Sequence, residues 1–278
     1  SGSLNWIFAF YFVFNLAILL FTVPAAWLIA KFGSDRISLA GTASRAACFL
    51  LLILSAGQPL LVFPAAVIWG LAIPLYWLPF HLGVVGLDHK RTFALDASKI
   101  FLSAKMGAVS GPLIGGLIIS QLGFSWLYAI AIFFLLVSGL PPLFDRYEFK
   151  VPEISFSEIK KNIASNLRQM PKLYLAFGGS NINNQTYDIA WPLYVFLIVG
   201  SYQFLGLMTS LGLLASFATL AFVGRKADKM GNKILKFSLP LNFANLIVRG
   251  FLTAKPLLFL SDLAYQLVSI FVWVPFDR

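Results

Sequence analysis

A polar stretch, residues 178–188, interrupts an otherwise apolar segment of this sequence and reads GGSNINNQTYD. Four of its amide and carboxylate side chains follow the spacing i, i+3, i+4, i+7, which on a regular helix places them on one face. They are Asn181, Asn184, Gln185 and Asp188. Amides donate and accept hydrogen bonds, which suits hydroxyl-rich or zwitterionic solutes, and the carboxylate of Asp188 can bind a cation or a proton. The stretch is therefore a candidate binding site for a small solute.

These groups have an alternative role, which is hydrogen bonding between helices at about 0.6–2 kcal/mol per contact. Four of them on one face exceed what packing alone usually needs, so a binding site is the favoured interpretation. Facing segments are expected to complete the site with Tyr76, Trp77 and Gln266.

Other ionisable groups also lie within apolar segments, where exposure to lipid is costly and a functional role is the default hypothesis. His81 follows an aromatic, proline-containing run, and its imidazole is a candidate proton carrier. A neutral histidine near the end of its segment is the open alternative. Arg249 and Asp262 lie at nearly equal distances from Lys255, which marks a hairpin tip, so we predict an ion pair between them with a structural role.

Motifs for covalent or metal catalysis are absent from the sequence. It has no phosphate-binding loop, no H-E-x-x-H and no G-x-S-x-G. Its two histidines are too few for a histidine-rich metal site, and its one cysteine, Cys48, excludes a disulfide framework. We therefore predict a protein that is not an enzyme and that has neither a cofactor nor a bound metal.

The composition is that of a polytopic membrane protein. Of the 278 residues, 59% are hydrophobic and only 12% are charged, whereas soluble domains average about 25% charged residues. Nine segments are long and apolar enough to be transmembrane helices. They cover residues 4–30, 37–56, 60–85, 99–120, 124–144, 173–200, 204–224, 234–253 and 257–276. The predicted fold class is all-α.

The charges predict an orientation. The net charge is +10, and most of the 21 lysines and arginines gather around 31–36, 90–99, 146–172 and 225–236. Such loops face the cytoplasm by the positive-inside rule, which explains the charge without a nucleic-acid partner. We therefore predict a protein of the cell membrane with residue 1 outside the cell and residue 278 in the cytoplasm.

The one long loop, 145–172, divides the chain into an N-terminal bundle, 1–144, and a C-terminal bundle, 173–278. Ser155 and Glu158 have the spacing of a capping box, and apolar residues follow them at helical intervals. We predict an amphipathic helix on the cytoplasmic membrane surface.

Three glycine-containing motifs stand between or within the predicted spans. Residues 224–233 read GRKADKMGNK, and residues 26–35, AWLIAKFGSD, occupy an earlier turn on the same side. Glycine allows a tight turn in both. The fourth span contains GAVSGPLIGG at 107–116, where small residues four apart let two helices touch backbone to backbone.

These motifs resemble those of the major facilitator superfamily. The first is similar to its loop signature G-x-L-A-D-R-x-G-R-K, and the second keeps one glycine of that signature but has Ala30 in place of its aspartate. The residues in register are Gly33, Gly224, Asp228, Gly231 and Lys233. The fourth span matches the family pattern G-x-x-x-G-P-x-x-G-G through Gly107, Gly111, Pro112, Gly115 and Gly116.

The resemblance implies a two-bundle fold in which the nine spans correspond to helices two to ten of twelve, so we expect the first helix and the last two to be missing from this chain. It implies a monomeric secondary transporter, or permease, that moves a small solute by alternating access. The loop motif then serves the gate, and 173–200 lines the central cavity, with local unwinding permitted by Gly178 and Gly179. The expected partners are the solute, the lipid bilayer and a coupling proton or cation. Two alternatives stay open: an exporter of amphiphilic compounds in antiport, and a non-transporting membrane receptor or assembly subunit.

Overall fold

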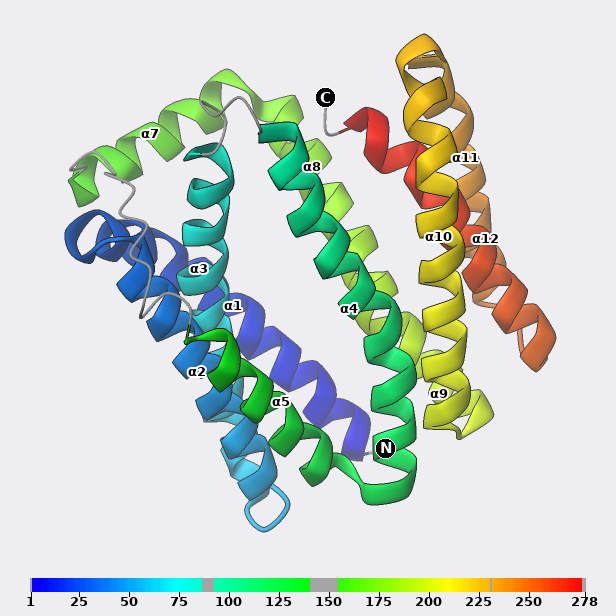
Figure 1. Cartoon of the computed structure of the whole chain (residues 1–278), viewed down its shortest axis with the longest axis horizontal. Helices are drawn as coiled ribbons and strands as arrows, with labels where there is room; N and C mark the ends of the chain where they lie inside the picture. The colour runs from blue at the N-terminus through cyan, green and yellow to red at the C-terminus, as the bar shows by residue number, and fades with distance from the viewer. Residues whose placement is uncertain (1, 87–92, 141–154, 231, 277–278) are drawn as a thin grey trace. The chain divides into compact units, whose positions relative to one another are not determined.

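The structure is a computed structural model that describes residues 2–86, 93–140, 155–230 and 232–276 (Figure 1). All regular elements in these ranges are helical. The chain folds into two compact units. Unit 1 comprises residues 1–97 and 124–178, and unit 2 comprises residues 98–123 and 179–278. The sequence-based division at residues 144 and 172 stays a prediction.

Unit 1 is built on three long helices, α1 (Gly2–Phe32), α2 (Ser34–Leu54) and α3 (Val62–Gly86), with a short 3-10 turn, η1 (Pro59–Leu61), before the third. Glycines allow close approach at two crossings. A Cβ at Gly41 would lie 2.9 Å from the backbone of Leu75, and one at Gly70 would lie 2.6 Å from the carbonyl oxygen of Phe14. Helix α5 (Phe124–Ser138) packs against α2.

Three helical segments in the described part of the chain are long and apolar enough to cross a membrane. They are Leu4–Phe32, Ser34–Leu54 and Pro59–Gly83. Two shorter apolar helical segments cover Met106–Leu122 and Phe124–Ser138. The described residues thus form helices of which several are apolar enough for a membrane protein, while the count of nine spans stays a prediction.

The predicted capping box is confirmed at the start of α7 (Phe156–Gln169). The hydroxyl of Ser155 accepts a hydrogen bond from the Glu158 N–H at 3.2 Å, and the Glu158 carboxylate accepts one from the Ser155 N–H at 2.9 Å. Two N–H groups at the start of the helix are thereby satisfied. The apolar residues Ile163, Leu167 and Met170 are exposed, about half of each side chain being accessible.

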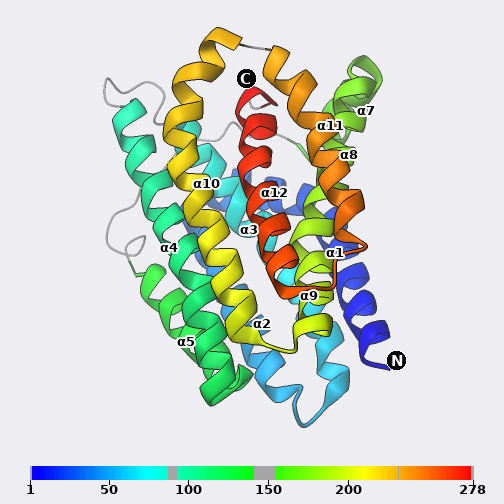
Figure 2. The same cartoon turned by 90° about the vertical axis from the view of Figure 1, so that its right-hand side faces the viewer.

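Unit 2 contains most of α4 (Phe93–Leu122), together with α10 (Tyr202–Met230), α11 (Asn232–Arg249) and α12 (Lys255–Phe276) (Figures 1 and 2). Helices α4 and α10 touch backbone to backbone: a Cβ at Gly116 would lie 2.5 Å from the carbonyl oxygen of Tyr202. The Leu113 N–H, next to Pro112, donates to the hydroxyl of Ser210 on α10 at 3.0 Å. This part of the GAVSGPLIGG motif therefore acts in helix packing.

The polar stretch of the sequence lies in a helix that changes type partway. Helix α8 (Pro171–Gln185) runs into a π-helical turn, η2 (Thr186–Ala190), and continues as α9 (Trp191–Val199). Proline has no N–H to donate, so Pro192 removes the α-helical bond to the Asp188 carbonyl and favours the wider turn. The helix is continuous through Gly178 and Gly179, so the local unwinding expected there is wrong; the irregularity lies after the polar cluster.

Candidate functional site

A buried polar cluster joins α11 and α12 inside unit 2. Helix α11 presents Ser238, Asn242, Asn245 and Arg249, all of them buried or half-buried, at intervals of four, three and four residues. Helix α12 faces them with Ser261, Asp262, Tyr265 and Gln266, of which each is at most 7% exposed. The helical period of 3.6 residues explains why each set lies on one face.

Arg249 and Asp262 lie together at the centre of this cluster. The Nη2 atom of Arg249 is 3.5 Å from Oδ1 of Asp262, and the two residues are 4% and 1% exposed. The guanidinium also donates to Ser261, from Nε to the hydroxyl at 3.2 Å and from Nη2 to the carbonyl at 3.0 Å. The structure therefore brings together the two residues that the sequence predicted as an ion pair.

Three aromatic rings surround the guanidinium. Its carbon lies 4.1 Å from the ring centroid of Trp191, 4.5 Å from that of Tyr265 and 5.4 Å from that of Tyr187. The Tyr187 and Tyr265 rings are stacked on each other with centroids 4.4 Å apart. Distances below about 6 Å allow cation–π attraction, so Arg249 is held by rings as well as by a carboxylate.

The two oxygens of Asp262 differ. Oδ1 accepts hydrogen bonds from the Trp191 indole at 2.9 Å and the Tyr187 hydroxyl at 3.3 Å, in addition to the arginine. Oδ2 is buried and has no hydrogen-bond partner among the described residues. It faces α10, where a Cβ at Gly212 would lie only 2.9 Å away.

A further layer of polar contacts extends from α8 to α12. The Asn183 amide donates to the Tyr265 hydroxyl at 3.0 Å, and the Gln266 amide donates to the Tyr187 hydroxyl. Asn183, Tyr187 and Trp191 follow one another at four-residue intervals, and together they form the face that packs on α12.

The predicted solute-binding residues occupy other positions on this helix. Asn181 and Asp188 are exposed, and Asn184 and Gln185 are half-buried. The π turn begins at Thr186, so Asp188 departs from the regular α-helical spacing that the sequence interpretation assumed. Gln266 is the one predicted member that belongs to the buried cluster.

Tyr76, Trp77 and His81 lie on α3 in unit 1. The Tyr76 ring receives the guanidinium of Arg45, with 3.9 Å from its carbon to the ring centroid. Trp77 and His81 are exposed, and their rings stack with centroids 5.8 Å apart. Their neighbours on α3 include the aromatic rings of Tyr76 and Phe80.

Some residues of the three glycine-containing motifs lie in the described part of the chain and others do not. Gly33 lies between α1 and α2 with φ of 87°, a conformation that favours glycine. Gly224 and Asp228 lie in α10 and Lys233 in α11, but their side chains and the whole of Gly231 lie outside the described residues. A Cβ at Gly107 or Gly111 would meet no described atom within 4 Å. Gly115 is half-buried.

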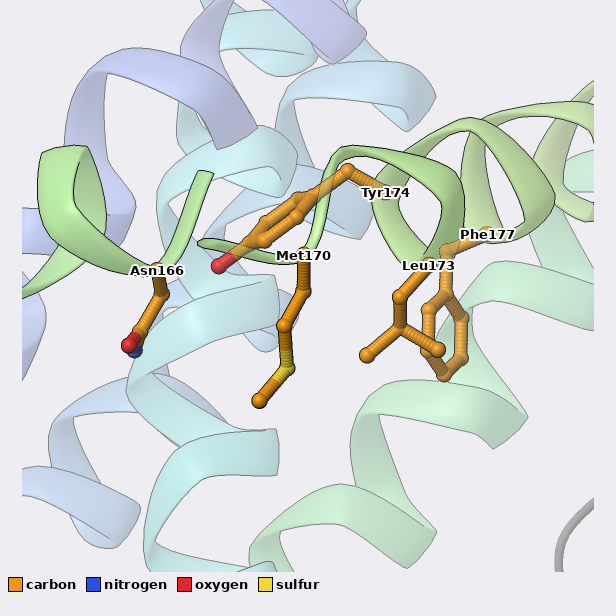
Figure 3. A pocket seen from close by; sticks show the side chains of 5 residues that line it. All are labelled: Asn166, Met170, Leu173, Tyr174 and Phe177. Carbon is orange, nitrogen blue, oxygen red and sulfur yellow. The ribbon is translucent and has the colours of Figure 1, made fainter. Parts of the chain in front are cut away.

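A separate pocket lies in unit 1 where α7 meets α8. It has a volume of about 300 Å³ and is lined by Asn166, Met170, Leu173, Tyr174 and Phe177. In Figure 3, Met170, Leu173 and Phe177 point to the same side of the chain. Its lining is apolar apart from one amide and one phenol, so it lacks the charged groups of the buried cluster.

The sequence interpretation overlooked most of the buried cluster. The polar residues of α11 recur at helical spacing within an apolar segment, which is the signal that marked 178–188. Their wider separation made that signal weaker. The aromatic partners of Arg249 gave no sequence signal, because Trp191 and Tyr265 lie far apart in the chain and aromatic residues are common in it.

Comparison with known families identifies the class of protein. A sequence model of the Major Facilitator Superfamily matches residues 1–274. The chain belongs to the major facilitator superfamily. Among curated proteins, no match to the chain was found.

Membership in the major facilitator superfamily makes the protein a membrane transporter and not an enzyme. Members of this superfamily bind small-molecule substrates. Within the described residues, no group of three or more His, Cys, Asp or Glu side chains is placed to hold a metal ion.

Proposed function

We propose that this superfamily member is a secondary transporter that moves a small polar solute by alternating access, and that its α8–η2 segment binds the solute. The observation that carries the proposal is the division of polar groups in this segment. Asn183 and Tyr187 bond to α12, whereas Asp188 is exposed and Asn184 and Gln185 are half-buried. Asn181, one turn before them, is exposed as well. The second set is in a position to contact a solute.

The chemistry of these groups favours a polar solute. Three amides offer donors and acceptors to hydroxyl, carboxylate or ammonium groups, and one carboxylate offers a negative charge. Polar groups in the membrane-spanning part of a protein are costly unless they are used. The π turn supports the same role, because such turns occur frequently at functional sites.

The remaining parts of the proposal follow from the sequence. Asp188 and His81 are the candidates to carry a coupling proton or cation. The loop motif around Asp228 serves the gate at the cytoplasmic side, with residue 1 outside, residue 278 inside and the protein in the cell membrane. Nine spans arranged as two bundles complete this arrangement, and the transporter acts as a monomer.

Flux measurements on reconstituted protein test this function. Proteoliposomes would be supplied with a radiolabelled hexose, a zwitterionic amino acid or an alkylammonium ion, and saturable uptake or efflux would be recorded. Asn184→Ala and Asp188→Asn are each expected to abolish or strongly weaken transport without loss of folded protein, because they remove groups that contact the solute.

Asn15→Ala is the matched control. Asn15 is an exposed amide on α1 whose side chain donates to the carbonyl of Tyr11 in its own helix, at 2.8 Å. Normal flux in both test variants would remove the α8–η2 segment from consideration. Binding of a solute without flux would identify the protein as a receptor on this fold.

A further inference from the structure

The guanidinium of Arg249 is bound in the way that a protein binds a free organic cation. Three aromatic rings lie between 4.1 and 5.4 Å from its carbon, and the Asp262 carboxylate lies beside it. Aromatic rings around a cation, with a carboxylate nearby, are the chemistry by which proteins recognise quaternary ammonium and guanidinium groups. The surroundings of Arg249 are therefore a cation cage, made of Tyr187, Trp191, Tyr265 and Asp262.

Arg249 fits this cage incompletely. Its Nη1 atom and the Oδ2 atom of Asp262 are buried, and neither has a hydrogen-bond partner among the described residues. The pair is joined by one contact of 3.5 Å, whereas arginine and a carboxylate commonly form two shorter parallel bonds. A buried charge pair with unmet hydrogen bonds is weakly favourable at best. The cage thus binds Arg249 less tightly than it would bind a cation that satisfied all of its hydrogen-bonding groups.

The position of Arg249 in the chain provides a route out of the cage. It is the last residue of α11, and the residues that follow it, Gly250 and Phe251, are exposed. The turn is fastened to α9 by Tyr194, whose hydroxyl donates to the carbonyl of Leu252 at 2.9 Å and lies 3.4 Å from that of Gly250. Rearrangement of this turn would withdraw the guanidinium without unfolding a helix.

We propose that the cation cage is a binding site for the cationic group of the transported solute, and that Arg249 occupies it as a tethered competitor. The inference rests on the proposed function and narrows the substrate class to solutes with a guanidinium or alkylammonium group. A solute cation entering the cage pairs with Asp262 and displaces Arg249 toward the exposed turn. The tether lowers the apparent affinity for solute by the fraction of time that Arg249 fills the cage.

Calorimetric titration of the purified full chain in detergent tests this inference without requiring transport. The probe is methylguanidinium, and methylurea is its neutral analogue of similar shape. Removing the tether in Arg249→Ala is expected to tighten methylguanidinium binding by at least about tenfold, since a cage filled nine-tenths of the time imposes that penalty. Methylurea is expected to bind neither protein measurably.

Arg45→Ala is the matched control, because Arg45 also rests on a ring, that of Tyr76, but belongs to unit 1 and is not part of the cation cage. It is expected to leave methylguanidinium binding unchanged. Adding Trp191→Leu to Arg249→Ala is expected to abolish the gained binding. Equal tightening in Arg45→Ala, or equal binding of methylurea, would overturn the inference.

Tyr194→Phe keeps the inference testable if Arg249→Ala fails to fold, because it retains both members of the buried pair. Loss of the hydroxyl loosens the turn, so methylguanidinium is expected to bind several-fold more tightly than to the parent protein. Unchanged affinity in folded Tyr194→Phe would count against a releasable Arg249. Transport of neutral solutes only, with no cation bound by any variant, would overturn the inference while leaving the proposed transport function in place.

Discussion

Two polar regions of unit 2 contrast in how their side chains are used. Around Arg249, polar and aromatic groups from α8 to α12 are buried and largely bonded to one another. On the exposed side of α8 and η2, Asn181 and Asp188 remain accessible. Both regions contain the residue types that suggest a binding site. The difference shows that residue type and spacing alone do not predict which polar groups are buried in contacts between helices and which stay exposed.

The largest difference between the two regions is expected in the free energy of unfolding when the aspartate of each region is replaced by alanine. Asp262→Ala leaves the buried charge of Arg249 without its partner, which typically costs about 3–5 kcal/mol. Asp188→Ala removes an exposed carboxylate, and surface changes of this kind usually stay within about 0.5 kcal/mol. Denaturant unfolding in detergent measures both. Equal destabilisation by the two substitutions would remove the distinction between the regions.

A smaller effect on stability is expected from adding one methyl group in each of the two polar regions. In Gly212→Ala the new Cβ would lie 2.9 Å from Oδ2 of Asp262 and 3.0 Å from the side chain of Gln266. Overpacking of this kind costs about 1–3 kcal/mol. Gly179→Ala meets nothing within 4 Å and replaces glycine inside a helix, so a gain of roughly 0.5–1 kcal/mol is expected. Thermal unfolding compares the two variants, and destabilisation in both would contradict the contrast.

Loss of a single hydroxyl probes the border between the regions. Tyr265→Phe removes the acceptor of the Asn183 amide, a bond of 3.0 Å, while the stacking with Tyr187 is retained. The expected cost is about 0.6–2 kcal/mol, the usual range for such bonds between membrane helices. Tyr174→Phe is the control, because Tyr174 lies in unit 1 at the separate pocket. A neutral effect of Tyr265→Phe would show that Asn183 is not held by α12.

Much of the helical architecture was predictable from the sequence, because long apolar segments and a capping box depend on local composition. Helices of the described residues overlap the predicted spans, three of them long and apolar enough to cross a membrane, and Ser155 and Glu158 form the predicted reciprocal bonds. The ends of the helices differ: α10 continues to Met230, so the loop motif that was placed in a turn is largely helical.

The candidate site was less predictable from the sequence, because it depends on which helix faces pack against one another. The regular spacing of Asn181, Asn184, Gln185 and Asp188 suggested one face, but Pro192 removes a helical bond and a π turn follows. Asn183, which lies outside that spacing, bonds to Tyr265 on α12. The cation cage depends on Trp191, Arg249 and Tyr265, which come from three helices. Local patterns carry no information about such a meeting.

The smallest effect is expected in unit 1, at the exposed start of α7. The N–H and hydroxyl of Ser155 bond to Glu158 and hold the pKa of its carboxyl below its usual value. A carboxyl whose pKa is lower in the folded state stabilises the helix at pH values above its pKa in the unfolded chain, which is about 4.3. This contribution is lost as the pH falls through the lower folded-state pKa. A spin label at Ala164→Cys is therefore expected to become more mobile below about pH 4.3. Glu158→Gln retains the capping box but cannot titrate, so its label should show a weaker pH dependence. An identical pH profile in both proteins would show that Glu158 does not control the start of this helix.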